Sequence, residues 1–460
     1  MESINLPTLL GILLYAVVLF RWSKKTLSPA FSRYLVLAWA AQWGFALLLY
    51  WTFTRYYENR VTADIFKYFD DAGRWFTLWQ TDAHEAWRIW LGQQPVTDMG
   101  TQTVQSMRFW GKVNHYGLYN DNQTMIRLHG LLYFFSRGNY GLHSLFFIGL
   151  HFFSLAWLFR TLHGALSSGG QRLLFVLLFG IPSVLFWGAG TTKETLMLTM
   201  LAGWLGGMWE WEKHRRRRGL LLMLGSMLGL VFVKMYLLGF LMLALIPWLW
   251  NTWRKPTRPV VSYLVFYGLV LPAALLLNHR QHASDMTPEL WEQYGSRAFC
   301  IADSTSYRKN AMDNGWHILE KLRFKQQDFV KEATFEQAGS MRPIPRLNGQ
   351  ATNFFQALPE GMLITLFAPW PWEIDRTLYL WPLIENLILW SVWIFFLWKY
   401  PPSRLSNHGW FWLFFALSLA AFLGLMTPVL GNLVRYKLPV LWILALWPCL
   451  FLMAPKNNPS

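Results

Sequence analysis

The sequence predicts an all-α polytopic membrane protein with about eleven transmembrane helices and two long polar segments between them. Of its 460 residues, 54% are hydrophobic and only 14% are charged, with 29 tryptophans and 35 phenylalanines. The apolar residues fall into runs of about 17 to 25, the length that a helix needs to cross a bilayer. Lysines and arginines gather in short loops between these runs, which is typical of cytoplasmic loops of membrane proteins.

The composition also excludes several classes of protein. The formal charge of +16 does not indicate nucleic-acid binding, because the basic residues lie largely in those short loops. Cys300 and Cys449 are far apart in the chain, so neither a disulfide framework nor a thiolate metal site is predicted. The first apolar stretch, 6–20, follows no basic region and has no small-residue cleavage site, so we expect a retained span. No boundary of a soluble domain is visible, and residues 1–460 are interpreted as one integral membrane domain.

Hydropathy places the spans along the chain in this order. They are expected near 5–20, 33–53, 142–160, 172–188, 194–211, 219–233, 235–251, 260–277, 378–398, 409–427 and 437–454. The first long polar segment is then 54–140, and the second is 278–377.

The end of the second segment, 353–373, is apolar but contains three prolines. Pro359, Pro369 and Pro371 interrupt it, because proline lacks the N–H group that a helix interior uses. We interpret it as an interfacial or re-entrant part, with Trp370 and Trp372 at the level of the lipid headgroups. A twelfth span is the alternative.

Three basic loops determine the orientation. They follow the first, fifth and seventh spans and are all expected to be cytoplasmic. They contain Arg21, Lys24, Lys25 and Arg33, then Lys213 and residues 215–218, then Arg254, Lys255 and Arg258. An even number of spans separates these loops from one another, so all three can lie on the same side of the membrane. With eleven spans, this places the N-terminus and both long segments outside and the C-terminus in the cytoplasm.

In this topology four groups of ionisable residues come out on the outer face. Charged residues at a membrane boundary need a reason, and a shared face suggests a common site. The groups are Asp64 with Asp70 and Asp71, Lys193 with Glu194, Lys234, and Arg435 with Lys437.

The acidic group belongs to a predicted amphipathic helix at 63–75. A helical projection places the charged residues on one arc and the aromatic residues on the opposite arc. The charged arc contains Asp64, Lys67, Asp70, Asp71 and Arg74. This arc is either a solvated polar face with internal ion pairs, or a source of a carboxylate that accepts a proton from a substrate hydroxyl.

The basic groups lie at short turns. Thr191 or Thr192 can cap the helix that starts near Lys193. The dipole of that helix disfavours a cation at its N-terminus. We therefore expect Lys193 to have an anionic partner, such as a phosphate. Lys234 has no other charge nearby in sequence and either extends to headgroups or binds an anion.

Two further basic residues are expected at the outer face. Arg435, beside Tyr436, is expected on the outer face, where the positive-inside rule makes an arginine unusual. This position indicates a contact with an anion, and the planar guanidinium group suits a pair of phosphate oxygens. Further upstream, Arg127 lies in a stretch that predicts a short interfacial helix, where it would face headgroups. His129 in the same stretch is interpreted as a packing residue.

The order of these motifs resembles a known class. An acidic amphipathic helix in an early loop is followed by PSVLFWGAGTTKE, LPEGMLITLFAPWPWE and GNLVRYKLP. Together they resemble the GT-C class of polytopic membrane glycosyltransferases, in particular the uncharacterised Bacteroidota-type members described as dolichyl-phosphate-mannose-protein mannosyltransferase-like. The likeness is distributed over most of the chain.

The resemblance implies a GT-C fold in a bacterial inner membrane and a polyprenyl-phosphate-linked sugar donor. It also implies an outward-facing site and a carboxylate of the first long segment as catalytic base. Carried onto this sequence, the base is Asp70 or Asp71, with Asp64 third. The contacts to the donor and its phosphate would come from Lys193, Glu194, Lys234, Arg435, Tyr436 and Arg127.

These inferences predict an inverting glycosyl transfer to a saccharide, lipid or protein hydroxyl. No spacing demands a metal, and a divalent cation between Asp70, Asp71 and a phosphate is left open. The alternatives are a transporter or flippase of lipid-linked saccharides, and a polysaccharide polymerase or ligase. A transporter should show broken helices in pairs and an internal repeat, neither of which the sequence indicates.

Overall fold

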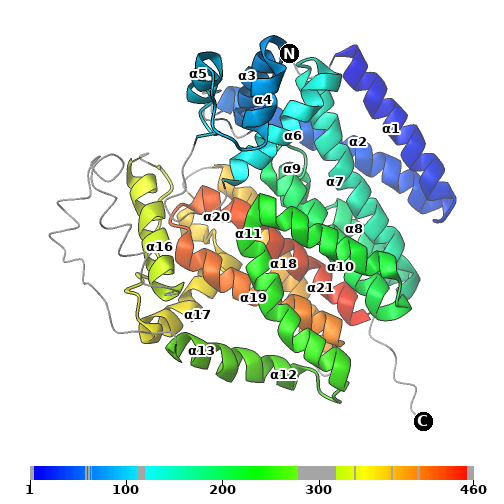
Figure 1. Ribbon diagram of the computed structural model, residues 1–460. Helices are drawn as coiled ribbons and strands as arrows, with labels where there is room; N and C mark the ends of the chain where they lie inside the picture. The colour runs from blue at the N-terminus through cyan, green and yellow to red at the C-terminus, as the bar shows by residue number, and fades with distance from the viewer. Residues whose placement is uncertain are drawn as a thin grey trace. The chain divides into compact units, whose positions relative to one another are not determined.

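The computed structural model describes residues 5–56, 60, 63, 65–111, 120–277, 318–335, 338–374, 377–400 and 405–452. Within these ranges the chain is helical, with no β-strand other than an isolated bridge between Met341 and Val429 (Figure 1). The prediction of an all-α protein is confirmed. The chain forms two compact units, Met1–Leu238 and Gly239–Ser460, which are described separately.

Six helices among the described residues are long and apolar enough to cross a membrane. They are Leu6–Lys24, Pro29–Arg55, Tyr140–Ala165, Arg217–Arg254, Leu380–Lys399 and Asn407–Met426. Shorter apolar helices cover Ser168–Phe179, Val260–Leu276 and Leu438–Cys449. These helices indicate a membrane-embedded protein, while the number of eleven spans stays a prediction.

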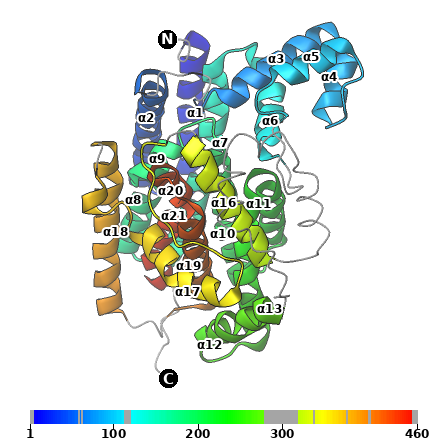
Figure 2. The same cartoon turned by 90° about the vertical axis from the view of Figure 1, so that its left-hand side faces the viewer.

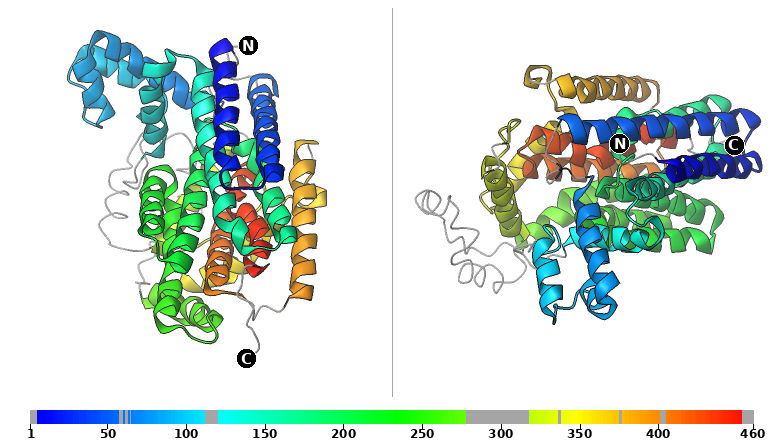
Figure 3. Two further views of the ribbon diagram at one scale, coloured as in Figure 1. Left: turned by 90° about the vertical axis from the view of Figure 1, so that its right-hand side faces the viewer. Right: turned by 90° about the horizontal axis from the view of Figure 1, so that it is seen from above.

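The first unit is built around three long helices. They are α1 (Leu6–Lys24), α2 (Pro29–Trp51), which continues into the π-helical turn η1 (Thr52–Tyr56), and α7 (Tyr140–Leu162). Figure 3 shows α1 and α2 side by side. The Tyr15 hydroxyl donates to the carbonyl of Gly149 at 2.6 Å, and the Trp39 indole donates to the carbonyl of Ile12 at 3.2 Å, so these two polar groups connect the three helices.

The other helices of the first unit form an outer group and an inner group. The outer group lies at one end of the unit (Figure 2) and contains α3 (Lys67–Thr81), α4 (Ala83–Trp90), α5 (Asp98–Ser106) and α6 (Asp121–Ser136). The inner group contains η2 (His163–Ala165), α8 (Ser168–Phe179), α9 (Pro182–Trp187), α10 (Lys193–His214) and α11 (Arg217–Arg254) up to Leu238.

One of the expected spans is divided in the structure. The range 172–188 is not one helix but two, α8 and α9, because Gly180 ends the first and Pro182 can only occupy the first turn of a new helix. The ranges 219–233 and 235–251 are two helices that meet at a kink, as predicted, and share the label α11. Lys234, the residue predicted between them, has a non-helical backbone there (φ −155°, ψ 71°).

The second unit contains α12 to α21. Its helices are α12 (Val260–Val265), η3 (Phe266–Val270), α13 (Leu271–Leu277), α16 (Ile318–Phe335), α17 (Ala351–Phe367), η5 (Pro371–Glu373), η6 (Thr377–Tyr379), α18 (Leu380–Lys399), α19 (Asn407–Met426), α20 (Leu430–Tyr436) and α21 (Leu438–Leu452). The proline-containing range 353–373 therefore holds a continuous helix, α17, which passes through Pro359 and ends before Pro369.

Helices α17 and α19 pack with their backbones in contact. A Cβ atom at Gly361 would lie 2.7 Å from the carbonyl oxygen of Ala421, and one at Gly424 would overlap the carbonyl of Gly361. Small residues at such a crossing let two apolar helices approach closely, which is how helices associate in lipid.

We expect Gly424→Ala to destabilise the second unit by about 1–3 kcal/mol, because its methyl group has no space against the backbone of α17. The measurement is thermal unfolding in detergent. Gly239→Ala is the matched control, since a Cβ there meets no atom within 4 Å; equal unfolding temperatures for the two variants would contradict this packing.

Candidate functional site

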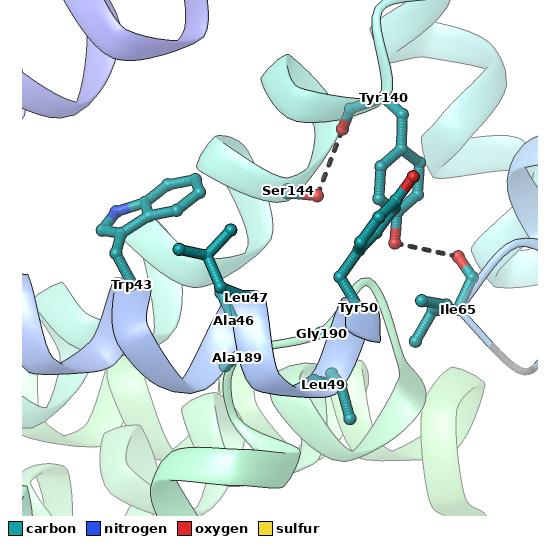
Figure 4. A pocket seen from close by; sticks show the side chains of 10 residues that line it. All are labelled: Trp43, Ala46, Leu47, Leu49, Tyr50, Ile65, Tyr140, Ser144, Ala189 and Gly190. Carbon is teal, nitrogen blue, oxygen red and sulfur yellow. Dashed lines mark hydrogen bonds between the residues drawn. The ribbon is translucent and has the colours of Figure 1, made fainter. Parts of the chain in front are cut away.

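Hydroxyl groups fix the start of α3 beside the turn that precedes α10. The carbonyl of Ile65 accepts hydrogen bonds from Thr191 (2.8 Å) and Tyr140 (3.2 Å; Figure 4). Thr191 and Thr192 are fully buried, and Thr192 occupies the cap position of α10 without a side-chain cap bond. The hydroxyl of Thr191, predicted as a possible cap of the next helix, thus binds the backbone of the first long segment instead.

Lys193 projects from this turn into the first long segment. Its ammonium group donates to Asp121 Oδ1 at 2.5 Å and to Asn122 Oδ1 at 2.8 Å. The Tyr68 hydroxyl donates to the same Asn122 oxygen at 3.2 Å. The prediction that Lys193 has an anionic partner is confirmed, and the partner is the carboxylate of Asp121 at the start of α6.

The next residue of α10 connects this group to α11. Glu194 is 1% exposed, and its Oε1 lies 3.6 Å from the ammonium nitrogen of Lys234. The interruption of α11 occurs at this lysine. Lys193 and Lys234, predicted from separate turns, therefore pair with two different carboxylates, Asp121 and Glu194.

A third lysine, from α3, completes the group. The ammonium of Lys67 lies 5.0 Å from the ring centroid of Tyr68 and 5.2 Å from that of Phe109. We call this arrangement the lysine cluster; it consists of Lys67, Lys193 and Lys234 with Tyr68, Asp121, Asn122 and Glu194. Three of the described side chains in the lysine cluster carry ammonium groups and two carry carboxylates.

Solvent reaches the lysine cluster mainly at Asp121. The side chain of Asp121 is 34% exposed, whereas that of Lys193 is 9% exposed. Burial lowers the pKa of Lys193 to about 8; Asp121 opposes the shift, and the charges of Lys234 and Lys67 add to it. An anion entering beside Asp121 would stabilise the charged form of Lys193.

Asp71, one of the aspartates predicted as catalytic base, is buried in the structure. It is 2% exposed, and its two oxygens accept hydrogen bonds from the backbone N–H groups of Arg108 (3.1 Å) and Phe109 (2.8 Å). Arg74 pairs with it at 3.1 Å, as the helix projection predicted. Burial raises the pKa of Asp71, although these hydrogen bonds and Arg74 lower it. Asp71 thus positions the loop whose Phe109 ring lies beside Lys67.

The other two predicted aspartates have different environments. Asp70 is 33% exposed and accepts two hydrogen bonds from Arg60, at 2.9 and 3.2 Å. This bidentate geometry is typical of an arginine–carboxylate pair. Asp64 lies outside the described residues.

The remaining predicted residues lie in other parts of the two units. Arg127 donates to the carbonyl of Trp90 at 2.6 Å and to Gln123 at 3.3 Å, so it connects α6 to the end of α4. Arg435 and Tyr436 lie at the end of α20 in the second unit, and their place in a common site stays a prediction. There, Lys437 donates to the carbonyl of Ala368 and to Asn386.

His129 has the packing role that the sequence indicated. It is fully buried, and its Nδ1 lies 2.8 Å from Nδ1 of His143. In the part of the chain that the structure describes, no three His, Cys, Asp or Glu side chains are arranged to hold a metal.

Sequence reasoning missed the acidic side of the lysine cluster. In the sequence, Asp121 and Asn122 stand at the start of a helix. Asp and Asn are common there for structural reasons, so their position gave no sign of a site. Only the contact between α6 and the turn before α10 shows that these side chains surround Lys193.

Comparison of the chain with models of protein families, with curated proteins and with solved structures finds no match in any of the three.

We expect Asp71→Asn and Asp70→Asn to differ in their effects on structure. An amide at position 71 would turn a donor toward a backbone N–H group, so that variant should lose about 1–3 kcal/mol of stability. Asp70→Asn breaks a partly exposed pair and should cost less than about 1 kcal/mol. Hydrogen exchange of the amides of Arg108 and Phe109 measures the difference; unchanged protection in Asp71→Asn would show that this carboxylate does not hold the loop.

Proposed function

We propose that this chain is a GT-C-type glycosyltransferase that moves a sugar from a polyprenyl-phosphate-linked donor to an acceptor hydroxyl with inversion. The observation that carries the proposal is the convergence of three lysines from separate parts of the chain. Lys193 pairs with the partly exposed Asp121, Lys234 pairs with the neighbouring Glu194, and Lys67 lies over the same Tyr68 ring as Lys193. The proposal includes eleven spans and a site on the outer face.

The lysine cluster suits the leaving group of this reaction. As the bond between the anomeric carbon and the phosphate oxygen breaks, the electron pair stays on the phosphate, which gains negative charge. Ammonium groups already in place stabilise that charge, and they do so more strongly in a partly buried site than in water. Lys193 is held by Asp121 and Asn122 before any ligand binds, so little reorganisation is needed.

The geometry favours Asp121 as the catalytic base, rather than the aspartates that the sequence suggested. The carboxylate must accept the proton of the acceptor hydroxyl while the oxygen attacks the anomeric carbon, which is attached to the phosphate. Asp121 contacts Lys193 at 2.5 Å and reaches solvent. Lys193 bonds to Oδ1 of Asp121, whereas Arg60 bonds to both oxygens of Asp70. Both oxygens of Asp71 accept from backbone N–H groups.

One observation favours the alternative of a transporter for lipid-linked saccharides. Interrupted helices with a charged residue at the break are typical of transporter binding sites, and α11 is interrupted at Lys234. In that case the lysine cluster would bind the same phosphate without breaking a bond.

The test is transfer by the purified protein in liposomes, with polyprenyl phosphates carrying radiolabelled hexoses as donors. Loss of a phosphate contact in Lys193→Gln or Lys234→Gln should raise the KM for the donor about 10-fold or more. Loss of the base in Asp121→Asn should lower kcat about 100-fold or more with KM little changed.

Lys213→Gln, an exposed lysine at the other end of α10, is the matched control and should behave as the wild type. Full kcat in Asp121→Asn would remove Asp121 from the reaction. Movement of intact donor across the liposome membrane without any transferred sugar would favour the transporter.

We also expect donor binding to weaken as the pH rises through about 8, because Lys193 then loses the charge that binds the phosphate. Its charge is complete well below that value, so binding should be tightest at neutral pH. Lys193→Arg keeps the charge at every accessible pH and should flatten the profile between pH 7 and about 9. Identical pH profiles for the two proteins, measured as donor affinity in nanodiscs, would contradict this role.

A further inference from the structure

A stack of aromatic rings in the second unit ends at the surface. Its ring centroids are 4.7 Å apart between Trp390 and Phe367, 5.5 Å between Phe367 and Trp370, and 5.1 Å between Trp370 and Trp372. Successive ring planes are inclined by only 18°, 13° and 7°. Trp372 is the last ring of the stack and is 77% exposed, so the indole face turned away from Trp370 is open to a ligand.

Buried polar groups fix the backbone that carries this stack. The carbonyl of Ala368 accepts hydrogen bonds from the buried side chains of Lys437 (2.5 Å) and Asn386 (2.9 Å). In the following turn, the N–H group of Glu373 donates to the carbonyl of Trp370, and the N–H group of Trp370 donates to Oε2 of Glu373, each at 2.9 Å. The open ring is therefore oriented before a ligand binds, which reduces the entropy lost on binding.

A carboxylate belongs to the same turn as the open ring. Glu373 directly follows Trp372, its side chain is 20% exposed, and its Oε1 pairs with Arg342 at 3.2 Å. Among the described residues each oxygen of this carboxylate contacts one polar group, whereas a carboxylate accepts about four hydrogen bonds. Glu373 can therefore accept further hydrogen bonds from the hydroxyl groups of a ligand.

The chemistry of this turn fits a neutral saccharide. A pyranose ring has a face of C–H groups that packs on an indole through dispersion and through attraction to the negative face of the ring. Hydroxyl groups at the edge of the same pyranose can donate to a carboxylate. An anionic ligand is disfavoured, because Glu373 repels it and the guanidinium of Arg342 is engaged by that carboxylate.

The stack also distinguishes Trp372 from an indole that only marks the membrane interface. Such an indole needs no neighbouring ring to fix its plane. Trp398, at the opposite end of α18, is 84% exposed and has no stacked ring among the described residues. Trp372 instead has a fixed plane with a carboxylate in the same turn, which is the arrangement that a flat, hydroxyl-rich ligand requires.

We propose that Trp372 and Glu373 form a binding site for a neutral saccharide. One pyranose ring stacks on the open face of Trp372, and its hydroxyl groups donate to Glu373. As an acceptor site this inference rests on the proposed function, and it selects a saccharide from the acceptors expected there. Saccharide binding itself requires neither a donor nor a transfer reaction, so it can be measured separately.

Saturation-transfer-difference NMR of the full-length protein in nanodiscs tests the site without any donor. The probes are cellohexaose, chitohexaose and maltohexaose, and we expect binding with the largest transfer at C–H protons of the pyranose rings. Trp372→Ala removes the stacking face and should weaken binding about 10-fold. Glu373→Gln loses the charged acceptor and should weaken it about 5-fold. Trp372→Phe keeps an aromatic face and should bind more tightly than Trp372→Ala.

Trp398→Ala is the matched control, because it removes an equally exposed indole from the same unit, and it should bind as the wild type does. Thermal unfolding confirms that each variant is folded. Equal binding by Trp372→Ala and the wild type overturns the inference, as does the absence of binding of all three saccharides. An equal loss in Trp398→Ala and Trp372→Ala also overturns it, since both indoles would then act only through the membrane. Saccharide binding that depends on Trp372 in a protein without transfer activity supports the site and refutes only the proposed function.

Discussion

The buried ammonium group of Lys193 is the constraint on which the first unit depends. A charge at the end of an apolar helix is costly to remove from water unless it is paired and hydrogen-bonded. Asp121 and Asn122 supply both, and they begin α6, so the long segment before α7 must fold back onto the turn before α10. Glu194 extends the same constraint to Lys234 in α11.

The hydroxyl groups of the turn reinforce this arrangement. Thr191 and Tyr140 both donate to the carbonyl of Ile65, immediately before α3. Asp71 in α3 then holds the backbone at Arg108 and Phe109, and Phe109 faces Lys67. The lysine cluster is thus assembled through successive contacts between short helices rather than along one helix.

The helices could largely be predicted from the sequence, and so could one of their interruptions. Long apolar runs such as α1, α2 and α7 need only hydropathy and length to be recognised. The break at Lys234 was predicted because a lysine there separates two apolar runs. The division at Gly180 and Pro182 was missed although it carried a local signal, because proline begins helices more readily than it continues them.

The sequence by itself determined the all-α membrane class, the amphipathic α3 and the need of Lys193 for an anionic partner, because periodicity, hydropathy and the helix dipole act over one or two turns. Tertiary structure decided which carboxylate that partner is. It also decided that Asp71 is enclosed by a loop more than 30 residues away while Asp121 remains open to solvent. Such roles depend on burial and on contacts between distant segments, and no local pattern contains that information.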